Sequence, residues 1–161
     1  MRFEIGIPTL NRIDLLMPCL IMYKQDFPDT RIWVLDNGKQ NIKLDGIELI
    51  KADSNLGVAA SWNLLSDKIF QSATHALILN DDIYLGKKKH QINDIIENKK
   101  FKGRVIRSTP DWCAFILPKE VFDEVGRFDE EFYPAYYEDK SYEYRMKLMG
   151  LNVVKTPLLN P

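Results

Sequence analysis

The sequence predicts an α/β fold in which helices flank a mainly parallel central sheet. In the first half of the chain, short apolar runs alternate with longer segments of helical spacing, and polar residues and glycines follow each run. A chain of 161 residues with 45% hydrophobic residues can bury one sizeable core. No repeat, low-complexity tract or linker divides it. We therefore expect a single domain, residues 1–161.

The elements of the first half follow from apolar periodicity. Residues 3–7 read as a strand that Pro8 ends. Apolar residues then recur at helical spacing over 13–23, with Pro18 expected in the first turn and Asp14 as a candidate N-cap. Further strands are predicted at 31–35, 47–50 and 76–79, and a helix at 58–69.

The second half predicts shorter and more mixed elements. A polar helix at 87–100 carries an apolar stripe of Ile92, Ile95 and Ile96. A last helix over 138–149 is closed by Gly150. Further strands are predicted at 104–107, 113–117 and 152–155, and a short helix at 118–125.

Charge and composition exclude several classes of protein. The formal net charge is −1, which removes the general electrostatic case for binding nucleic acid. The two cysteines, Cys19 and Cys113, lie far apart and argue against a disulfide scaffold or structural zinc. No apolar run approaches the roughly 20 residues needed to cross a bilayer. We expect a cytoplasmic protein with no nucleic-acid partner and no transmembrane segment.

Polar residues gather where the predicted strands end, which is where ligands bind in open α/β sheets. The segments are Pro8-Thr9-Leu10-Asn11-Arg12, Asp36-Asn37-Gly38, Ala52-Asp53-Ser54-Asn55-Leu56-Gly57 and Asn80-Asp81-Asp82. The chain lacks the G-x-G-x-x-G, G-x-x-x-x-G-K-[ST] and G-x-S-x-G motifs. A dinucleotide site, a phosphate loop and the commonest hydrolase signature are therefore disfavoured.

Two acidic pairs are candidates for chemistry. Asp81 and Asp82 follow an apolar strand and can hold Mg²⁺ or Mn²⁺, although a solvated turn with Asp82 as a helix cap is an equal alternative. Glu138 and Asp139 follow two tyrosines, and flanking aromatic rings can desolvate a carboxylate and raise its pKa towards that of a general base. Acidic residues are also favoured at a helix N-terminus for their interaction with the helix dipole.

Two further residues have competing interpretations. Trp112 stands at the entrance of a strand, where an aromatic ring can serve as a stacking surface for a sugar, but core packing is the commoner role. Cys113 has no histidine near it in sequence, which favours a buried thiol over a nucleophile.

Taken in order, these segments resemble the inverting family-2 glycosyltransferases of the GT-A fold. The matching stretches are IPTLNR (7–12), VLDNG (34–38), NLGVAASWN (55–63), LNDD (79–82), AFIL (114–117) with EVF (120–122), and VGRFDEEF (125–132) leading into YED (137–139). The resemblance implies a metal-assisted transfer of a sugar from a nucleotide-sugar donor, with a UDP-sugar preferred. The acceptor would be a glycan or another hydroxyl compound, and the enzyme a hexosyltransferase.

The resemblance also implies roles for individual residues. Residues 1–82 would form the nucleotide-binding half, and residues 83–161 the acceptor and catalytic-base half. The donor would be bound by Pro8, Thr9, Asn11, Arg12, Asp36, Asn55, Gly57, Asn63, Asp81 and Trp112. Asp82, with Asp81, would hold a divalent cation, Mn²⁺ or Mg²⁺. Asp139 would be the catalytic base, with Glu138 beside it.

The chain departs from the family pattern at two of these places. Asn80 stands where a third acidic residue is frequent, and Ser141 where many members carry another aspartate. Two alternatives remain: a nucleotidyltransferase on a related fold, and a catalytically inactive module that binds nucleotide sugars. The first would be expected to open with a Gly-rich loop after the first strand, which Pro8-Thr9-Leu10-Asn11 lacks.

Overall fold

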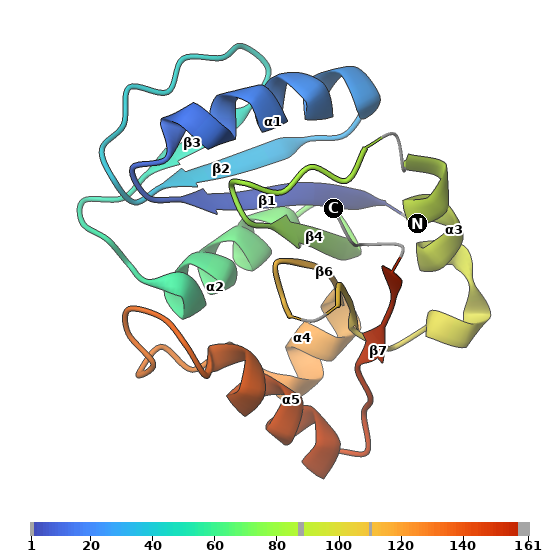
Figure 1. Cartoon of the computed structure of the whole chain (residues 1–161). Helices are drawn as coiled ribbons and strands as arrows, with labels where there is room; N and C mark the ends of the chain where they lie inside the picture. The colour runs from blue at the N-terminus through green and yellow to red at the C-terminus, as the bar shows by residue number, and fades with distance from the viewer. Residues whose placement is uncertain (1, 87–88, 110, 158–161) are drawn as a thin grey trace.

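The structure, a computed structural model, describes residues 2–86, 89–109 and 111–157. These residues form a seven-stranded sheet in the order β3-β2-β1-β4-β6-β5-β7, with helices on both faces (Figure 1). The strands are β1 (Phe3–Thr9), β2 (Ile32–Asp36), β3 (Glu48–Lys51), β4 (His75–Leu79), β5 (Ile106–Arg107), β6 (Ala114–Pro118) and β7 (Val154–Lys155). The helices are α1 (Ile13–Asp26), α2 (Val58–Ile69), α3 (Lys89–Glu97), α4 (Lys119–Val125) and α5 (Glu138–Leu148).

The predicted mainly parallel α/β sheet is confirmed. The first four strands all pair in parallel, so they end at the same edge of the sheet. Strand β6 runs antiparallel to both of its neighbours, β4 and β5, while β7 pairs with β5 in parallel. The parallel half therefore presents the ends of β1, β2 and β4 together, and β6 begins beside the end of β4.

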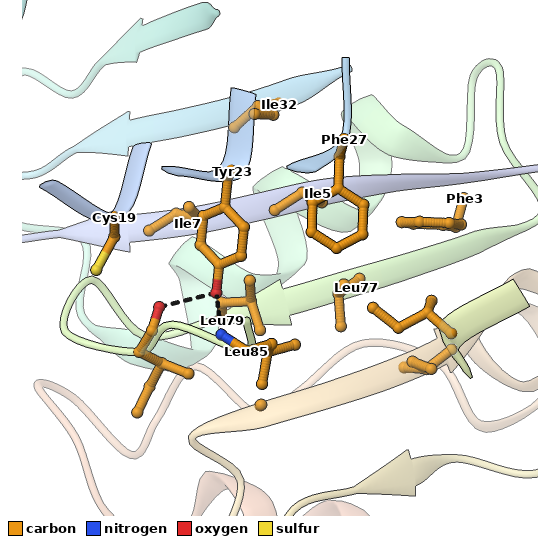
Figure 2. Close-up of a cluster of buried hydrophobic side chains, with 14 of the residues drawn as sticks. Phe3, Ile5, Ile7, Cys19, Tyr23, Phe27, Ile32, Leu77, Leu79 and Leu85 are labelled. Carbon is orange, nitrogen blue, oxygen red and sulfur yellow. Dashed lines mark hydrogen bonds between the residues drawn. The ribbon is translucent and has the colours of Figure 1, made fainter. Parts of the chain in front are cut away.

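Two hydrophobic clusters cover the two faces of the sheet. Successive residues of a strand point to opposite faces, so Leu77 and Leu79 join the cluster under α1 and α3, whereas Ala76 and Ile78 join the one under α2, α4 and α5. Figure 2 shows the first cluster, where the Tyr23 hydroxyl donates a hydrogen bond to the Ile83 carbonyl at 2.8 Å. That bond fixes the chain after β4 against α1.

The structure corrects the predicted positions of two prolines. β1 continues through Pro8, which pairs with Leu35 of β2, because β4 pairs with β1 only as far as Gly6 and requires no N–H there. Pro18 lies inside α1 rather than in its first turn. Tertiary packing of the buried face of α1 holds the helix despite the lost backbone bond.

Other boundaries also move. Arg12, not Asp14, is the N-cap of α1, and Asp14 lies in the first turn, where its carboxylate pairs with Arg12 at 3.3 Å. The predicted helix at 87–100 is shorter: its first two positions lie outside the described residues, and α3 ends before a separate 3₁₀ turn, Lys99–Phe101. The Asn98 side chain begins that turn by accepting a hydrogen bond from the Lys100 N–H.

No helix in the described part of the chain is long and apolar enough to span a bilayer.

Candidate active site

A hollow of about 470 Å³, called hollow 1 below, lies where β1 and β4 end and α2 begins. Its lining includes six of the predicted donor-binding residues, namely Pro8, Thr9, Arg12, Asn55, Gly57 and Asp81. The edge of the sheet at which the parallel strands end is thus the place where these segments meet (Figure 1). This is the location that the strand-end rule predicts.

A chain of hydrogen bonds joins the ends of β1, β2 and β4 at this edge of the sheet. The Thr9 hydroxyl donates to Asp81 Oδ2 at 2.7 Å. The Gln40 side-chain amide donates to Thr9 Oγ1 and to Asp36 Oδ1, both at 3.2 Å. Gln40 therefore connects Asp36, the last residue of β2, through Thr9 to Asp81, which follows β4. Sequence analysis missed Gln40, since it belongs to no motif and its one local signal is its closeness to Asp36 in the chain.

Asp36 and Asn11 lie behind the lining of hollow 1. The Asp36 side chain is fully buried, and its Oδ1 accepts a hydrogen bond from the Gly38 N–H at 2.8 Å. Its Oδ2 has no hydrogen-bond partner among the described residues. Asn11, at φ 55°, packs on Gly38 so closely that a Cβ at Gly38 would lie 2.2 Å from Asn11 Oδ1. Only glycine fits there, which joins the loop after β1 to the loop after β2.

The start of α2 forms a second wall. Asn37, which sequence analysis did not single out, accepts a hydrogen bond from the Leu56 N–H at 3.1 Å and donates one to Ser61 Oγ at 3.0 Å. Asn55 Oδ1 accepts from the Gly57 N–H at 3.0 Å. These hydrogen bonds fix the turn before α2, so the turn needs no ligand to take its shape.

Asn63, which was predicted to bind the donor, lies apart from the residues that line hollow 1. It is fully buried and outside the lining of hollow 1. Its Nδ2 donates to the Phe128 carbonyl at 2.9 Å and to Glu130 Oε1 at 2.8 Å, and its Oδ1 accepts from the Phe128 N–H at 2.8 Å. Asn63 thus ties α2 to the loop before α5.

The two aspartates after β4 are placed differently. Asp81 is half-buried and lines hollow 1, whereas Asp82 is exposed and outside that lining. Burial raises the pKa of Asp81, the hydrogen bond from Thr9 opposes this, and the charge of Asp82 adds to the rise. Within residues 2–86, 89–109 and 111–157, no group of three or more His, Cys, Asp and Glu side chains is close enough to hold a metal ion. A pair of carboxylates still fits Mn²⁺ or Mg²⁺, because such ions are commonly held by one or two carboxylates together with substrate phosphates.

A second hollow of about 400 Å³, called hollow 2, adjoins the first. The two share Val58, Trp62, Asn80, Ala135 and Tyr136 in their linings. Both predicted catalytic carboxylates line hollow 2. The two acidic pairs, which are far apart in sequence, therefore open into neighbouring spaces.

Glu138 and Asp139 are the first residues of α5. Glu138 is 6% exposed and its Oε2 has no hydrogen-bond partner among the described residues. Burial raises the pKa of Glu138, and the N–H groups of Glu138 and Tyr136 oppose this. Asp139 Oδ1 accepts a hydrogen bond from the Lys140 N–H at 2.7 Å, and its Oδ2 lies 3.7 Å from Lys140 Nζ.

The tyrosines near this pair do not bury its carboxylates, although the sequence analysis considered that flanking rings could desolvate them. Tyr136 and Tyr137 are 80% and 68% exposed. Tyr142 lies in the core, stacked on Phe128 with ring centroids 4.1 Å apart. The Glu138 carboxyl group is therefore desolvated by its own burial in the protein and not by the rings of Tyr136 and Tyr137.

Trp112 belongs chiefly to the core. It is 3% exposed and packs edge-on against Phe115, with ring centroids 4.8 Å apart, although it also contributes to the lining of hollow 2. Its Nε1 donates to Glu143 Oε1 at 2.8 Å, which also accepts from Arg107 Nε at 2.9 Å. Cys113 is partly buried, and burial raises its pKa, which keeps the thiol protonated and favours the structural interpretation.

The fold is that of the GT-A nucleotide-diphospho-sugar transferases. A mannosyltransferase from Pyrobaculum calidifontis, solved with GDP-Man and Mn²⁺, superimposes with a TM-score of 0.72 over 97% of this chain at 14% identity. GalNAc-T7, solved with UDP, GalNAc and Mn²⁺, gives 0.75 over 99% at 10% identity. The bifunctional IspDF of Campylobacter jejuni gives 0.60 over 97% at 12% identity.

This chain spans 55%, 42% and 49% of those three chains, about half of each. No protein-family model matches the sequence, and no curated protein matches it. At these sequence identities the structural similarity shows the fold of the chain and not its activity.

Proposed function

We propose that this protein is a glycosyltransferase that moves a sugar, with inversion, from a nucleotide-sugar donor to an acceptor hydroxyl, assisted by a divalent metal ion. The observation that carries the proposal is the pair of adjoining hollows. Hollow 1 contains Asp81 and Arg12, and hollow 2 contains Glu138 and Asp139. Glycosyltransferase neighbours that were solved with GDP-Man or UDP and Mn²⁺ support the same class of reaction.

In this proposal, hollow 1 takes the nucleotide diphosphate. Thr9, Asn55 and the chain at Gly57 form its walls, and the buried Asp36 carboxylate lies behind Thr9. Asp81, with Asp82 beside it, would hold Mn²⁺ or Mg²⁺, and the bound ion would supply positive charge near the leaving diphosphate. The hydrogen bond from Thr9 keeps Asp81 turned towards the hollow and favours its ionised form.

The acceptor lies in hollow 2. Asp139 takes the proton of the acceptor hydroxyl as that oxygen attacks the anomeric carbon. The bond to the diphosphate breaks as the new bond forms on the opposite face, which inverts the anomeric configuration. Glu138, buried and one residue earlier, orients the acceptor or the backbone that carries Asp139. In this proposal residues 1–82 supply most of the donor site and residues 83–161 supply the carboxylates that activate the acceptor, while both hollows take lining residues from both halves.

A nucleotidyltransferase is the second candidate function, because the structural similarity to IspDF is compatible with it. The two reactions release different products. A glycosyltransferase releases a nucleoside diphosphate from a UDP-, GDP- or dTDP-sugar, or CMP from a CMP-sugar, whereas a nucleotidyltransferase releases pyrophosphate from a nucleoside triphosphate. Assays for each product with the same protein decide between them.

The first test is a calorimetric titration of UDP-, GDP-, dTDP- and CMP-sugars with and without Mn²⁺. At least one donor is expected to bind, and more tightly with metal. Asp82→Ala should weaken the metal-dependent part and leave the melting temperature unchanged, since Asp82 is exposed. Equal affinity in EDTA and in Mn²⁺ contradicts the metal assignment, and no binding by any donor contradicts the proposed function.

The second test is turnover by Asp139→Asn. This variant keeps the shape of the side chain but not its proton acceptance, so kcat should fall by about 10²–10⁴-fold with donor affinity retained. Glu138→Gln should cost less. Asp123→Asn, on α4 outside both hollows, is the matched control and should leave kcat unchanged. Near-normal turnover in Asp139→Asn together with loss in Glu138→Gln reverses the assignment of the pair.

A further inference from the structure

The lining of hollow 2 has an unusual charge composition. Three carboxylates line it, from Asp111, Glu138 and Asp139, and no Lys, Arg or His side chain does so among the described residues. Lys140 lies outside the lining, with its Nζ 3.7 Å from Asp139 Oδ2. A phosphate in this space would face several negative charges, whereas hydroxyl groups would find hydrogen-bond acceptors.

The rim of hollow 2 carries two exposed aromatic rings. Tyr136 and Tyr137 line it, yet they are 80% and 68% exposed. Both have left-handed backbone, with φ 80° and 75°, which is rare for bulky side chains. Backbone strain of this kind persists where the surrounding structure imposes it, and it clusters at functional sites. Here the strain accompanies rings that remain available to a ligand instead of entering the core.

The loop that carries these rings is fixed to the start of α2. The Val58 N–H donates to the Pro134 carbonyl at 2.9 Å. Gly57 permits the approach, because a Cβ there would lie 2.8 Å from Pro134 O and 3.0 Å from the ring of Tyr133. The backbone that leads to the two tyrosines is therefore held before any ligand arrives, which lowers the entropy cost of binding.

An uncharged sugar ring matches both features of hollow 2, its carboxylate acceptors and its exposed aromatic rings. Its C–H faces are apolar and stack on aromatic rings, and its hydroxyls donate hydrogen bonds to carboxylates. We propose that hollow 2 binds a neutral saccharide as the acceptor, with Tyr136 and Tyr137 as its stacking surface, and that it rejects acceptors that carry phosphate. This inference rests on the proposed function, and it narrows the acceptor from any hydroxyl compound to one chemical class.

The test uses the whole chain with ¹³C-labelled tyrosine rings, observed by NMR during titration with cellobiose, xylobiose, chitobiose or farnesyl phosphate. At least one disaccharide should shift the ring signals of Tyr136 and Tyr137 saturably, and farnesyl phosphate should not. Tyr136→Ala should weaken that binding by about tenfold, and Tyr136→Trp should bind like the unchanged protein, because stacking needs an aromatic ring rather than a hydroxyl. Tyr144→Ala, an exposed tyrosine of α5 outside the lining, is the control and should bind like the unchanged protein.

A second variant separates stacking from folding. Tyr136→Gly removes the ring and accommodates the left-handed backbone without strain, so its melting temperature should not fall while disaccharide binding does. The proposal is overturned if no disaccharide binds, if disaccharides bind equally to Tyr136→Ala, or if farnesyl phosphate binds more tightly than any of them. Donor titration is carried out on the unchanged protein, because Tyr136 also lines hollow 1. If no donor binds there, the proposed function fails; if a donor binds but no disaccharide does, only the present proposal fails.

Discussion

Glu143 is the residue whose loss should weaken the second half of the fold most clearly. Its Oε1 accepts hydrogen bonds from Arg107 Nε at 2.9 Å and from Trp112 Nε1 at 2.8 Å, which ties α5 to β5 and to the strand entrance before β6. The Arg107 side chain is 1% exposed. Glu143→Ala therefore removes the carboxylate from a buried cation and the acceptor from a buried indole N–H.

The expected magnitude follows from those contacts. Removing one partner of a buried ion pair costs about 3–5 kcal/mol. The Glu143 side chain is 26% exposed and Arg107 keeps its hydrogen bond to the Ser108 carbonyl, so we expect the lower end, about 3 kcal/mol. For a chain of this size, that corresponds to a fall in melting temperature of about 6–12 °C. Glu143→Gln keeps an acceptor but not the charge, and should cost about 1–2 kcal/mol.

The assay is urea unfolding at pH 7 together with scanning calorimetry, with Glu131→Ala as an exposed control that should change stability little. The dependence of the unfolding free energy on urea should stay the same in all variants. A loss below about 1 kcal/mol in Glu143→Ala would refute the reasoning, since it would show that water replaces the carboxylate at Arg107 without cost.

Three further outcomes are expected. Burial raises the pKa of Glu138, so the folded state disfavours its charged form; Glu138→Gln should melt higher at pH 7, and this gain should vanish below about pH 4, where an unfolded glutamate is also protonated. Gly57→Ala, at φ 79° and with its Cβ 2.8 Å from Pro134 O, should lower stability by about 1–3 kcal/mol and weaken donor binding, as calorimetry would show. Asn63→Ala should lower the free energy of unfolding by about 2–4 kcal/mol, because the hydrogen bonds to Phe128 are lost, and the folded protein should keep its donor affinity. A loss of donor affinity without a loss of stability would show that Asn63 binds the donor.

Much of the architecture follows from local patterns that the sequence carries by itself. Apolar runs with polar residues after them located the parallel strands, because strand period and turn chemistry act within a few residues. The same logic located Asp81 and Asp82 after β4, and Glu138 and Asp139 at the start of α5. Their roles as metal ligands and general base came from the resemblance to glycosyltransferases rather than from these local patterns, and they remain predictions until the variants are measured.

Tertiary structure decided which of these side chains face a common space. Gln40 reaches Thr9, and so connects to Asp81, only because β1, β2 and β4 lie side by side. Asn63 stands on the buried side of α2 and satisfies the backbone of Phe128, a contact between residues 65 positions apart that no local pattern encodes. Tyr136 is exposed at the rim of hollow 2 and has a left-handed backbone, and neither property could be read from the local sequence. Periodicity is a property of neighbours along the chain, whereas the direction of a side chain into a cavity depends on distant segments that pack together, so the sequence determined the elements and the fold determined the site.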